Sequence, residues 1–170
     1  ENELDRSKTI SDMFAELAET IPDHTAVVFK DRKYTYKELD ELSNRLGKYI
    51  VSQGIGTEDV VSILIPRCEY MAIAPMGVIK AGAAYLPLDP TYPKDRLMYM
   101  LEDSAAKLLI ADRELLHLVD GYQGPVLFTD EIPGLADIKA ELKKPQLHDL
   151  FILLYTSGST GVPKGCMLEY

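Results

Sequence analysis

The sequence predicts an α/β protein with a doubly wound, mostly parallel sheet that carries helices on both faces. From about residue 35 onward, short apolar runs of strand length alternate with segments that have helical periodicity. The chain has 170 residues, which suits one domain that buries about 70% of its unfolded surface. Its composition, 46% hydrophobic and 26% charged, is ordinary for a globular protein.

The first helix and an antiparallel hairpin precede the alternating region. Thr9 is a candidate N-cap, apolar residues follow at helical spacing, and Pro22 marks the end of this helix. Residues 25–36 then predict two short strands around a tight turn at Asp31 and Arg32. We expect this hairpin to decorate the main sheet.

The second helix has the clearest start signal in the chain. Thr35 followed by Glu38 has the spacing of a capping box, in which each side chain bonds the other residue's backbone N–H. Gly54 is the expected C-terminal glycine. The apolar face between them consists of Leu39, Leu42, Leu46, Tyr49 and Ile50.

The remaining elements alternate along the chain. Strands are predicted at 59–66, 83–89, 107–111, 125–128 and 149–155, and helices at 69–82, 93–104 and 113–121. Pro75 lies inside one helix and is expected to kink it, and Gly82 ends that helix. Residues 130–146 predict loop with one helical turn, and the acidic pair Glu102–Asp103 is expected on a solvated face.

Charge and cysteine content narrow the class of function. The 27 acidic and 18 basic residues give a net charge of −9, which argues against a nucleic-acid partner but not against a small phosphate ligand. The two cysteines and three histidines show no metal-type spacing, so a reduced, cytoplasmic protein is expected. The sequence contains neither a signal-peptide pattern at residues 1–10 nor a run of 18 apolar residues.

The stretch from Thr156 to Gly165 is the strongest candidate for a functional loop. Seven of its ten residues are Ser, Thr or Gly, which suits either a flexible linker or a cradle for phosphate. An apolar strand leads directly into it, and Pro163 stiffens it just before Lys164, which favours the phosphate cradle.

The residue types in this stretch fit an anionic ligand. Glycines let backbone N–H groups turn toward an anion, hydroxyls donate to phosphate oxygens, and a lysine adds a positive charge. The glycine spacing differs from a Walker A loop, and no Ser or Thr follows the lysine. The candidate nucleotide-binding residues are Thr156, Ser157, Gly158, Ser159, Thr160, Gly161 and Lys164.

Three stretches in order resemble the motifs of the adenylate-forming superfamily, in particular nonribosomal peptide synthetase adenylation domains. They are YTSGSTGVPKG at 155–165, YTYKELDELSNRL at 34–46 and IKAGAAYLPLDPTYPKDRL at 79–97. The first is similar to the family's phosphate loop, and the "DPTYP" of the third favours the amino-acid-activating branch. Tyr170 departs from the pattern, since family members usually have His after the Glu.

The resemblance implies a reaction and its partners. A carboxylate, most simply an amino acid, would react with ATP to give an acyl-adenylate and pyrophosphate. The acyl group would then pass to the phosphopantetheine thiol of a carrier protein. The seven loop residues would surround the β- and γ-phosphates, whereas the stretches at 34–46 and 79–97 would serve packing.

The same resemblance implies that the chain, residues 1–170, is the N-terminal part of an adenylation domain. The Mg²⁺ ligand and the catalytic residues would lie downstream, so we expect no adenylation by this part alone and some self-association. A D-alanyl carrier-protein ligase, an acyl-CoA ligase and a non-catalytic scaffold that retains the fold remain alternatives.

Overall fold

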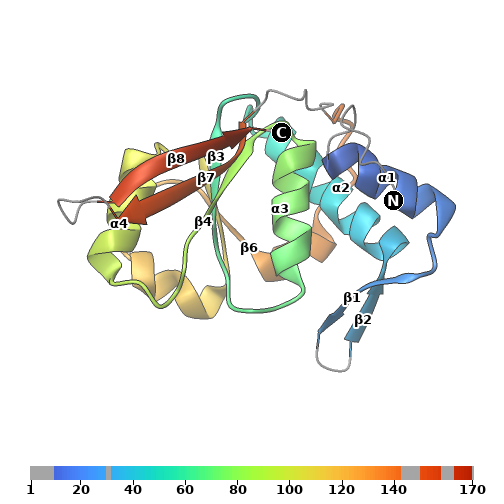
Figure 1. Cartoon of the computed structure of the whole chain (residues 1–170), viewed down its shortest axis with the longest axis horizontal. Helices are drawn as coiled ribbons and strands as arrows, with labels where there is room; N and C mark the ends of the chain where they lie inside the picture. The colour runs from blue at the N-terminus through green and yellow to red at the C-terminus, as the bar shows by residue number, and fades with distance from the viewer. Residues whose placement is uncertain (1–9, 30–31, 143–149, 158–162, 170) are drawn as a thin grey trace, which may run out of the picture.

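The structure, a computed structural model, describes residues 10–29, 32–142, 150–157 and 163–169 (Figure 1). The helices are α1 (Ile10–Thr20), α2 (Tyr36–Ser52), α3 (Tyr70–Lys80) and α4 (Lys94–Asp103), with 3₁₀ helices η1 (Arg113–Val119) and η2 (Thr129–Gly134). The strands are β1 (Thr25–Phe29), β2 (Arg32–Thr35), β3 (Val60–Leu64), β4 (Ala84–Pro87), β5 (Leu108–Ala111), β6 (Val126–Phe128), β7 (Leu150–Ser157) and β8 (Pro163–Glu169).

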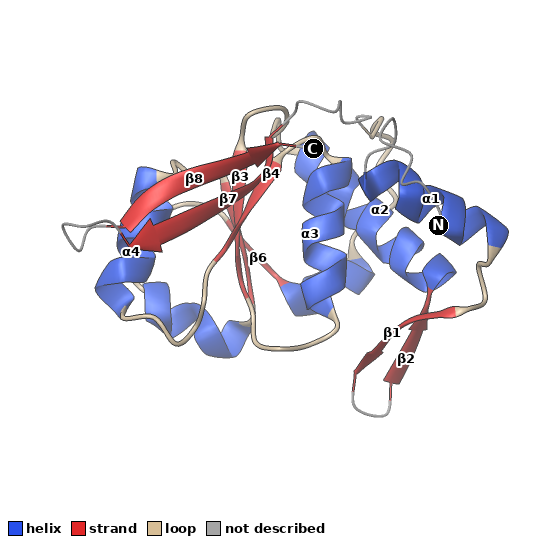
Figure 2. Ribbon diagram, in the orientation of Figure 1, coloured by secondary structure: helices blue, strands red, loops and turns tan. Residues whose placement is uncertain are grey.

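The main sheet confirms the predicted doubly wound architecture. Among the described residues its strand order is β6-β5-β3-β4-β7-β8, and every pair is parallel except β7 with β8. The chain crosses from β3 to β4 on one side and returns past β3 to β5 on the other. This reversal puts α3 and α4 on opposite faces (Figure 2).

Each face of the sheet has its own hydrophobic core. The core on the α2–α3 face includes Leu46, Val78 and Ile110, and the core on the α4–η1 face includes Leu97 and Leu109. All positions of β3 and β5 are buried, which is typical of parallel strands covered on both sides. The continuous apolar runs of the sequence therefore correspond to central strands.

The predicted start and end of the second helix are confirmed. The Thr35 hydroxyl accepts the Glu38 N–H at 3.1 Å, and the Glu38 carboxylate accepts the Thr35 N–H at 3.3 Å. Gly54, just after the C-cap residue Gln53, has a φ of +78°. An L-residue with a side chain is strained in that left-handed conformation, so glycine ends the helix cleanly.

The predicted hairpin at 25–36 is confirmed as a separate two-stranded sheet, β1–β2. Arg32 is the first residue of β2 rather than part of the turn, because it pairs in register with Phe29. Thr9 lies outside the described residues.

Helices α2 and α3 approach closely and share a buried lysine. A Cβ built at Gly77 would lie 2.5 Å from Leu46 Cδ2, so the α2–α3 contact requires a glycine there. The Lys80 ammonium donates to Asp40 Oδ1, Ser43 Oγ and Asn44 Oδ1, each at 2.8 Å. These bonds satisfy a cation whose side chain is only 6% exposed.

One predicted helix is of the 3₁₀ type, and one strand was not predicted. The short helix predicted at 113–121 is confirmed as the 3₁₀ helix η1, which ends at Val119, and the Asp112 carboxylate caps it by accepting the Glu114 N–H at 2.9 Å. Strand β8 was not predicted, since its sequence lacks alternation and begins with proline. It forms because the edge of β7 that faces away from β4 is available to pair with it.

Candidate functional site: the β7–β8 hairpin

The predicted phosphate stretch lies on the β7–β8 hairpin. β7 is parallel to β4, so its last residue, Ser157, lies toward the carboxyl-end side of the sheet. In open α/β sheets, ligands bind outside the carboxyl ends of the strands. The hairpin therefore begins its turn on the side of the sheet where a ligand site is expected.

The register of the hairpin brings the two ends of the stretch together. Thr156 pairs with Lys164, and Ser157 pairs with Pro163. Thr156, Ser157 and Lys164 thus belong to strands. The other four candidates, Gly158, Ser159, Thr160 and Gly161, lie outside the described residues.

The hairpin stem has few backbone links to the rest of the sheet. Among the described residues, β7 pairs with β4 at a single register point, Tyr85 with Ile152. β4 ends at Pro87, which has no N–H to donate to a neighbouring strand. Beyond Ile152, the side chains of Leu153 and Tyr155 connect β7 to the α4 side of the sheet.

One tyrosine links the stem to α4. The Tyr155 hydroxyl donates to Asp103 Oδ2 at 2.7 Å, and its ring meets the Tyr99 ring edge-on, with centroids 6.3 Å apart. Burial, and then the hydrogen bond to Asp103, raise the pKa of Tyr155, so its hydroxyl keeps the proton it donates. Figure 1 shows β7 ending beside α4.

This contact was not predicted from the sequence. Asp103 was expected with Glu102 on a solvated face, and both residues are indeed exposed, but Asp103 also has a partner 52 positions later in the chain. No local pattern identifies such a partner. The contact follows only a general tendency: a partly buried tyrosine hydroxyl usually finds a hydrogen-bond acceptor.

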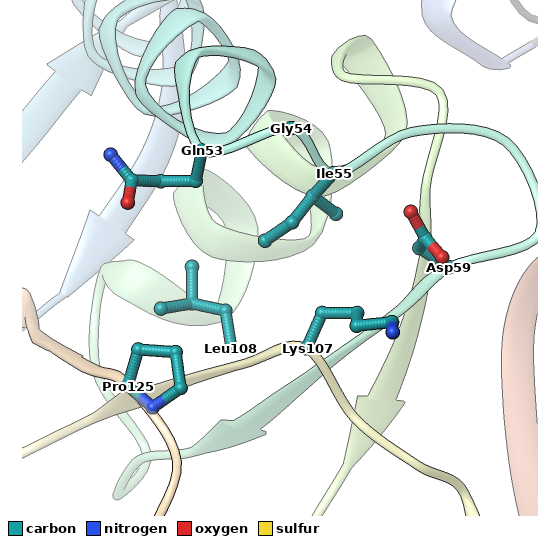
Figure 3. Close-up of a pocket in the computed structure, with 7 residues that line it drawn as sticks. All are labelled: Gln53, Gly54, Ile55, Asp59, Lys107, Leu108 and Pro125. Carbon is teal, nitrogen blue, oxygen red and sulfur yellow. The ribbon is translucent and has the colours of Figure 1, made fainter.

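A pocket of about 340 Å³ lies at the opposite end of the strands, where β3, β5 and β6 begin (Figure 3). It is lined by Gln53, Gly54, Ile55, Asp59, Lys107, Leu108 and Pro125. Asp59, Lys107 and Pro125 directly precede β3, β5 and β6, so this is the amino-end edge. The Asp59 carboxylate already accepts the Gly56 N–H at 2.9 Å. The pocket is therefore separate from the hairpin and from the edge where ligands bind in such sheets.

The described part of the chain contains neither a metal-ligand cluster nor a helix that could span a membrane. No group of three or more His, Cys, Asp or Glu side chains there is arranged to hold a metal ion. Among the same residues, none of the helices combines the length and the apolar character needed to cross a bilayer.

Comparison with protein families gives one match over most of the chain. The model of the family described as "AMP-binding enzyme" matches residues 14–170. Tyrocidine synthase 2 of Brevibacillus parabrevis is 42% identical over 164 residues, which is 96% of this chain and 4% of that protein. Zwittermicin A synthase ZmaJ of Bacillus cereus is 41% identical over 167 residues, or 96% of this chain and 31% of that protein.

Solved structures give the same result for the fold. The N-terminal subdomain of Klebsiella oxytoca NpsA, in complex with 3-hydroxybenzoyl-AMSN, superposes with a TM-score of 0.83 at 29% identity. The match covers 95% of this chain and 41% of that one. An artificially fused adenylation–PCP di-domain, NpsA-ThdA, matches with a TM-score of 0.86 at 28% identity, over 98% of this chain and 34% of that one.

The chain thus spans less than half of these relatives, and it matches them over nearly its whole length. The family assignment made from the three ordered motifs is confirmed by the family match and by the synthetases that share about 40% of its residues. The chain belongs to the AMP-binding enzyme family, and it has the fold of the N-terminal subdomain of adenylate-forming enzymes.

Proposed function

We propose that residues 1–170 are the N-terminal part of an amino-acid-activating adenylation domain. The complete domain joins an amino-acid carboxylate to the α-phosphate of ATP and releases pyrophosphate. The acyl group then passes from the adenylate to the thiol of a phosphopantetheine arm on a carrier protein. Residues 1–170 contribute the phosphate-binding hairpin, and the residues for the chemistry belong to the rest of the domain.

The observation that carries this proposal is the placement of the hydroxyl- and glycine-rich stretch. Its two ends lie on paired strands, with Thr156 and Lys164 at facing register positions, and β7 runs toward the carboxyl-end side of the parallel sheet. The stretch itself supplies hydroxyls, glycine backbone N–H groups and a lysine. Such groups suit a polyphosphate.

Each residue type has a distinct task toward the nucleotide. The hydroxyls of Thr156, Ser157, Ser159 and Thr160 donate to oxygens of the β- and γ-phosphates, while Gly158 and Gly161 allow the backbone to approach. The Lys164 ammonium offsets the charge of the leaving pyrophosphate. These groups position the triphosphate and stabilise charge that develops on it, which is how phosphate-binding groups usually accelerate such reactions.

Magnesium would be supplied with the ATP, and its charge would offset that of the phosphates. The described residues offer no cluster of three acidic, histidine or cysteine side chains for it. We assign its protein ligand, like the adenine and amino-acid pockets, to other parts of the complete domain.

The partners follow from the same reaction and from relatives. One structural neighbour is named as an adenylation–PCP fusion, which supports a carrier protein as the acceptor. Several relatives at about 40% identity are named as tyrocidine, gramicidin S and bacitracin synthases, which supports an amino acid as the acid. We place the protein in the cytoplasm, where ATP and amino acids are supplied.

A pyrophosphate-exchange assay tests the function. The chain, continued by the rest of an adenylation domain, is supplied with ATP, Mg²⁺, labelled pyrophosphate and single carboxylic acids. We expect label in ATP with one or a few of the twenty amino acids and none with the 170-residue chain alone. Absence of exchange with every amino acid and common aryl acid would contradict the amino-acid assignment.

The alternatives give different outcomes in the same experiment. A D-alanyl carrier-protein ligase would respond to D-alanine, and an acyl-CoA ligase would respond to fatty or aryl acids with coenzyme A as acceptor. A non-catalytic scaffold would have a reading frame that stops near Tyr170 and no exchange in any extended form.

A further inference from the structure

The base of the β7–β8 hairpin is attached to the α4 side of the sheet by the side chains of Leu153 and Tyr155. Leu153 is 8% exposed and packs into the core on the α4 side of the sheet. Tyr155 lies two residues further along β7, and alternate residues of a strand share a face. The stem is therefore attached to α4 through the Leu153–Tyr155 face.

Tyr155 occupies the last position before the hairpin's candidate ligands. It pairs in register with Gly165, and the next pair along is Thr156 with Lys164. A shift of the Tyr155 backbone is thus passed directly to the first and last polyphosphate-binding residues. Because β7 pairs with β4 only at Ile152 in the described part of the chain, no ladder bond to the central sheet there opposes such a shift.

On α4, Tyr99 and Asp103 are four residues apart, so they lie on one face of the helix. Their two contacts restrain different motions of Tyr155. The hydrogen bond to Asp103 Oδ2, at 2.7 Å, fixes the position of the hydroxyl, and the edge-on contact with Tyr99 fixes the tilt of the ring. Burial and the Asp103 bond both raise the pKa of Tyr155, so the donor proton is present throughout the neutral range.

We propose that Tyr155 is a positioning residue: its hydrogen bond to Asp103 sets where the hairpin holds the ATP phosphates, and α4 is the fixed point. This inference rests on the proposed function, because the position of the hairpin can affect KM for ATP only if the hairpin binds ATP. Tyr155 itself contacts neither substrate nor the reacting atoms.

The test measures KM for ATP and KM for the amino acid separately, by pyrophosphate exchange in the complete domain. In Tyr155→Phe the ring and its contacts remain and only the hydroxyl is lost. We expect KM for ATP to rise about three- to tenfold, as fits the loss of one hydrogen bond to a charged acceptor near the surface. We expect KM for the amino acid to stay within about twofold of the original value.

Asp103→Ala tests the acceptor, and the double variant tests whether the two residues act through one bond. If they do, the double variant raises KM for ATP no more than either single variant. Tyr122→Phe is the matched control: among the described residues its buried hydroxyl has no hydrogen-bond partner. Its removal should leave both KM values unchanged.

Hydrogen exchange gives a readout that does not depend on activity. Amides of the paired stem, such as those of residues 154–156 and 164–166, should exchange faster in Tyr155→Phe than in Tyr122→Phe. Amides of β3 and β5 should exchange at the same rate in both variants, because the central sheet is unchanged.

The outcomes separate this inference from the proposed function. If Lys164→Ala leaves KM for ATP unchanged, the proposed function fails. If Lys164→Ala raises it while Tyr155→Phe behaves like Tyr122→Phe, the positioning role alone is overturned. It is also overturned if Tyr155→Phe lowers kcat and the melting temperature with both KM values unchanged, since that pattern describes general destabilisation.

Discussion

The α2–α3 interface and the β7–β8 hairpin stem are stabilised in opposite ways. At the interface, two helices touch at Gly77, and the buried Lys80 ammonium on α3 donates to Asp40, Ser43 and Asn44 on α2. Within the described residues, the stem has one register pair with β4 and a surface hydrogen bond from Tyr155 to Asp103. The proposed phosphate site therefore adjoins the region that has fewer hydrogen-bonded links to the rest of the described structure.

Removing the buried charge should give the largest loss of stability. Lys80→Met keeps most of the aliphatic volume but leaves Asp40, Ser43 and Asn44 without their shared donor. We expect the free energy of unfolding to fall by about 2–4 kcal/mol in urea denaturation, because Asp40 is only partly hydrated.

A partly exposed lysine of α2 is the control for Lys80. Lys48 pairs with Asp137 at 3.8 Å, and the Asp137 side chain is 91% exposed. Lys48→Met should cost less than about 1 kcal/mol. Equal losses in the two variants would show that the buried lysine contributes nothing special to the α2–α3 interface.

Adding one methyl group at the helix contact should have the next largest effect. In Gly77→Ala the new Cβ would lie 2.5–2.8 Å from three Leu46 side-chain atoms, so the helices must separate. We expect a loss of about 1–3 kcal/mol in unfolding free energy. Gly134→Ala, where no atom lies within 4 Å of a new Cβ, should be close to neutral.

In the hairpin, removal of the Lys164 charge should weaken ATP binding without changing the free energy of unfolding. Lys164→Ala should raise KM for ATP in pyrophosphate exchange about tenfold or more, which corresponds to about 1.4 kcal/mol. Lys107→Ala, at the amino-end edge of the sheet, changes the net charge equally and should have no such effect. A similar rise in both variants would mean that general electrostatics, rather than the hairpin, controls ATP binding.

The smallest expected effect is a change in alkaline stability. Burial, and then the nearby Glu69, raise the pKa of Tyr70 from 10.0 to about 12. The folded chain thus keeps this proton after the unfolded chain has lost it, and the free energy of unfolding falls as pH rises from 10.0 to about 12.

Tyr70→Phe should therefore lose less stability than the original protein over that pH range. The pKa of Lys80 is lowered, chiefly by burial, so its contribution has the opposite sign, but it is present in both proteins and cancels in the comparison. Parallel pH curves in urea denaturation would contradict the assigned shift at Tyr70.

The sequence predicted the elements whose signals are local. The Thr35–Glu38 capping box and the left-handed glycines Gly54 and Gly82 fix helix ends through neighbouring residues alone. The parallel strands were predictable because burial on both faces demands continuous apolar runs. The phosphate stretch was found by its residue types, and its two ends are now located on paired strands.

The remaining features depend on residues far apart in the chain. Lys80 lies 36–40 positions from its partners on α2, and Tyr155 lies 52 positions from Asp103, so neither contact has a local pattern. Strand β8 has weak strand composition and exists through its pairing with β7. Tertiary contacts, rather than local propensity, determine the Lys80 hydrogen bonds, the Tyr155–Asp103 hydrogen bond and strand β8.

The most direct test of the nucleotide-binding role is a crystal structure of the complete adenylation domain with Mg²⁺ and ATP. We predict that the β- and γ-phosphates lie against the hairpin between Thr156 and Lys164, on the carboxyl-end side of the sheet. A triphosphate bound anywhere else, for example in the pocket beside Asp59 and Lys107, would contradict the account.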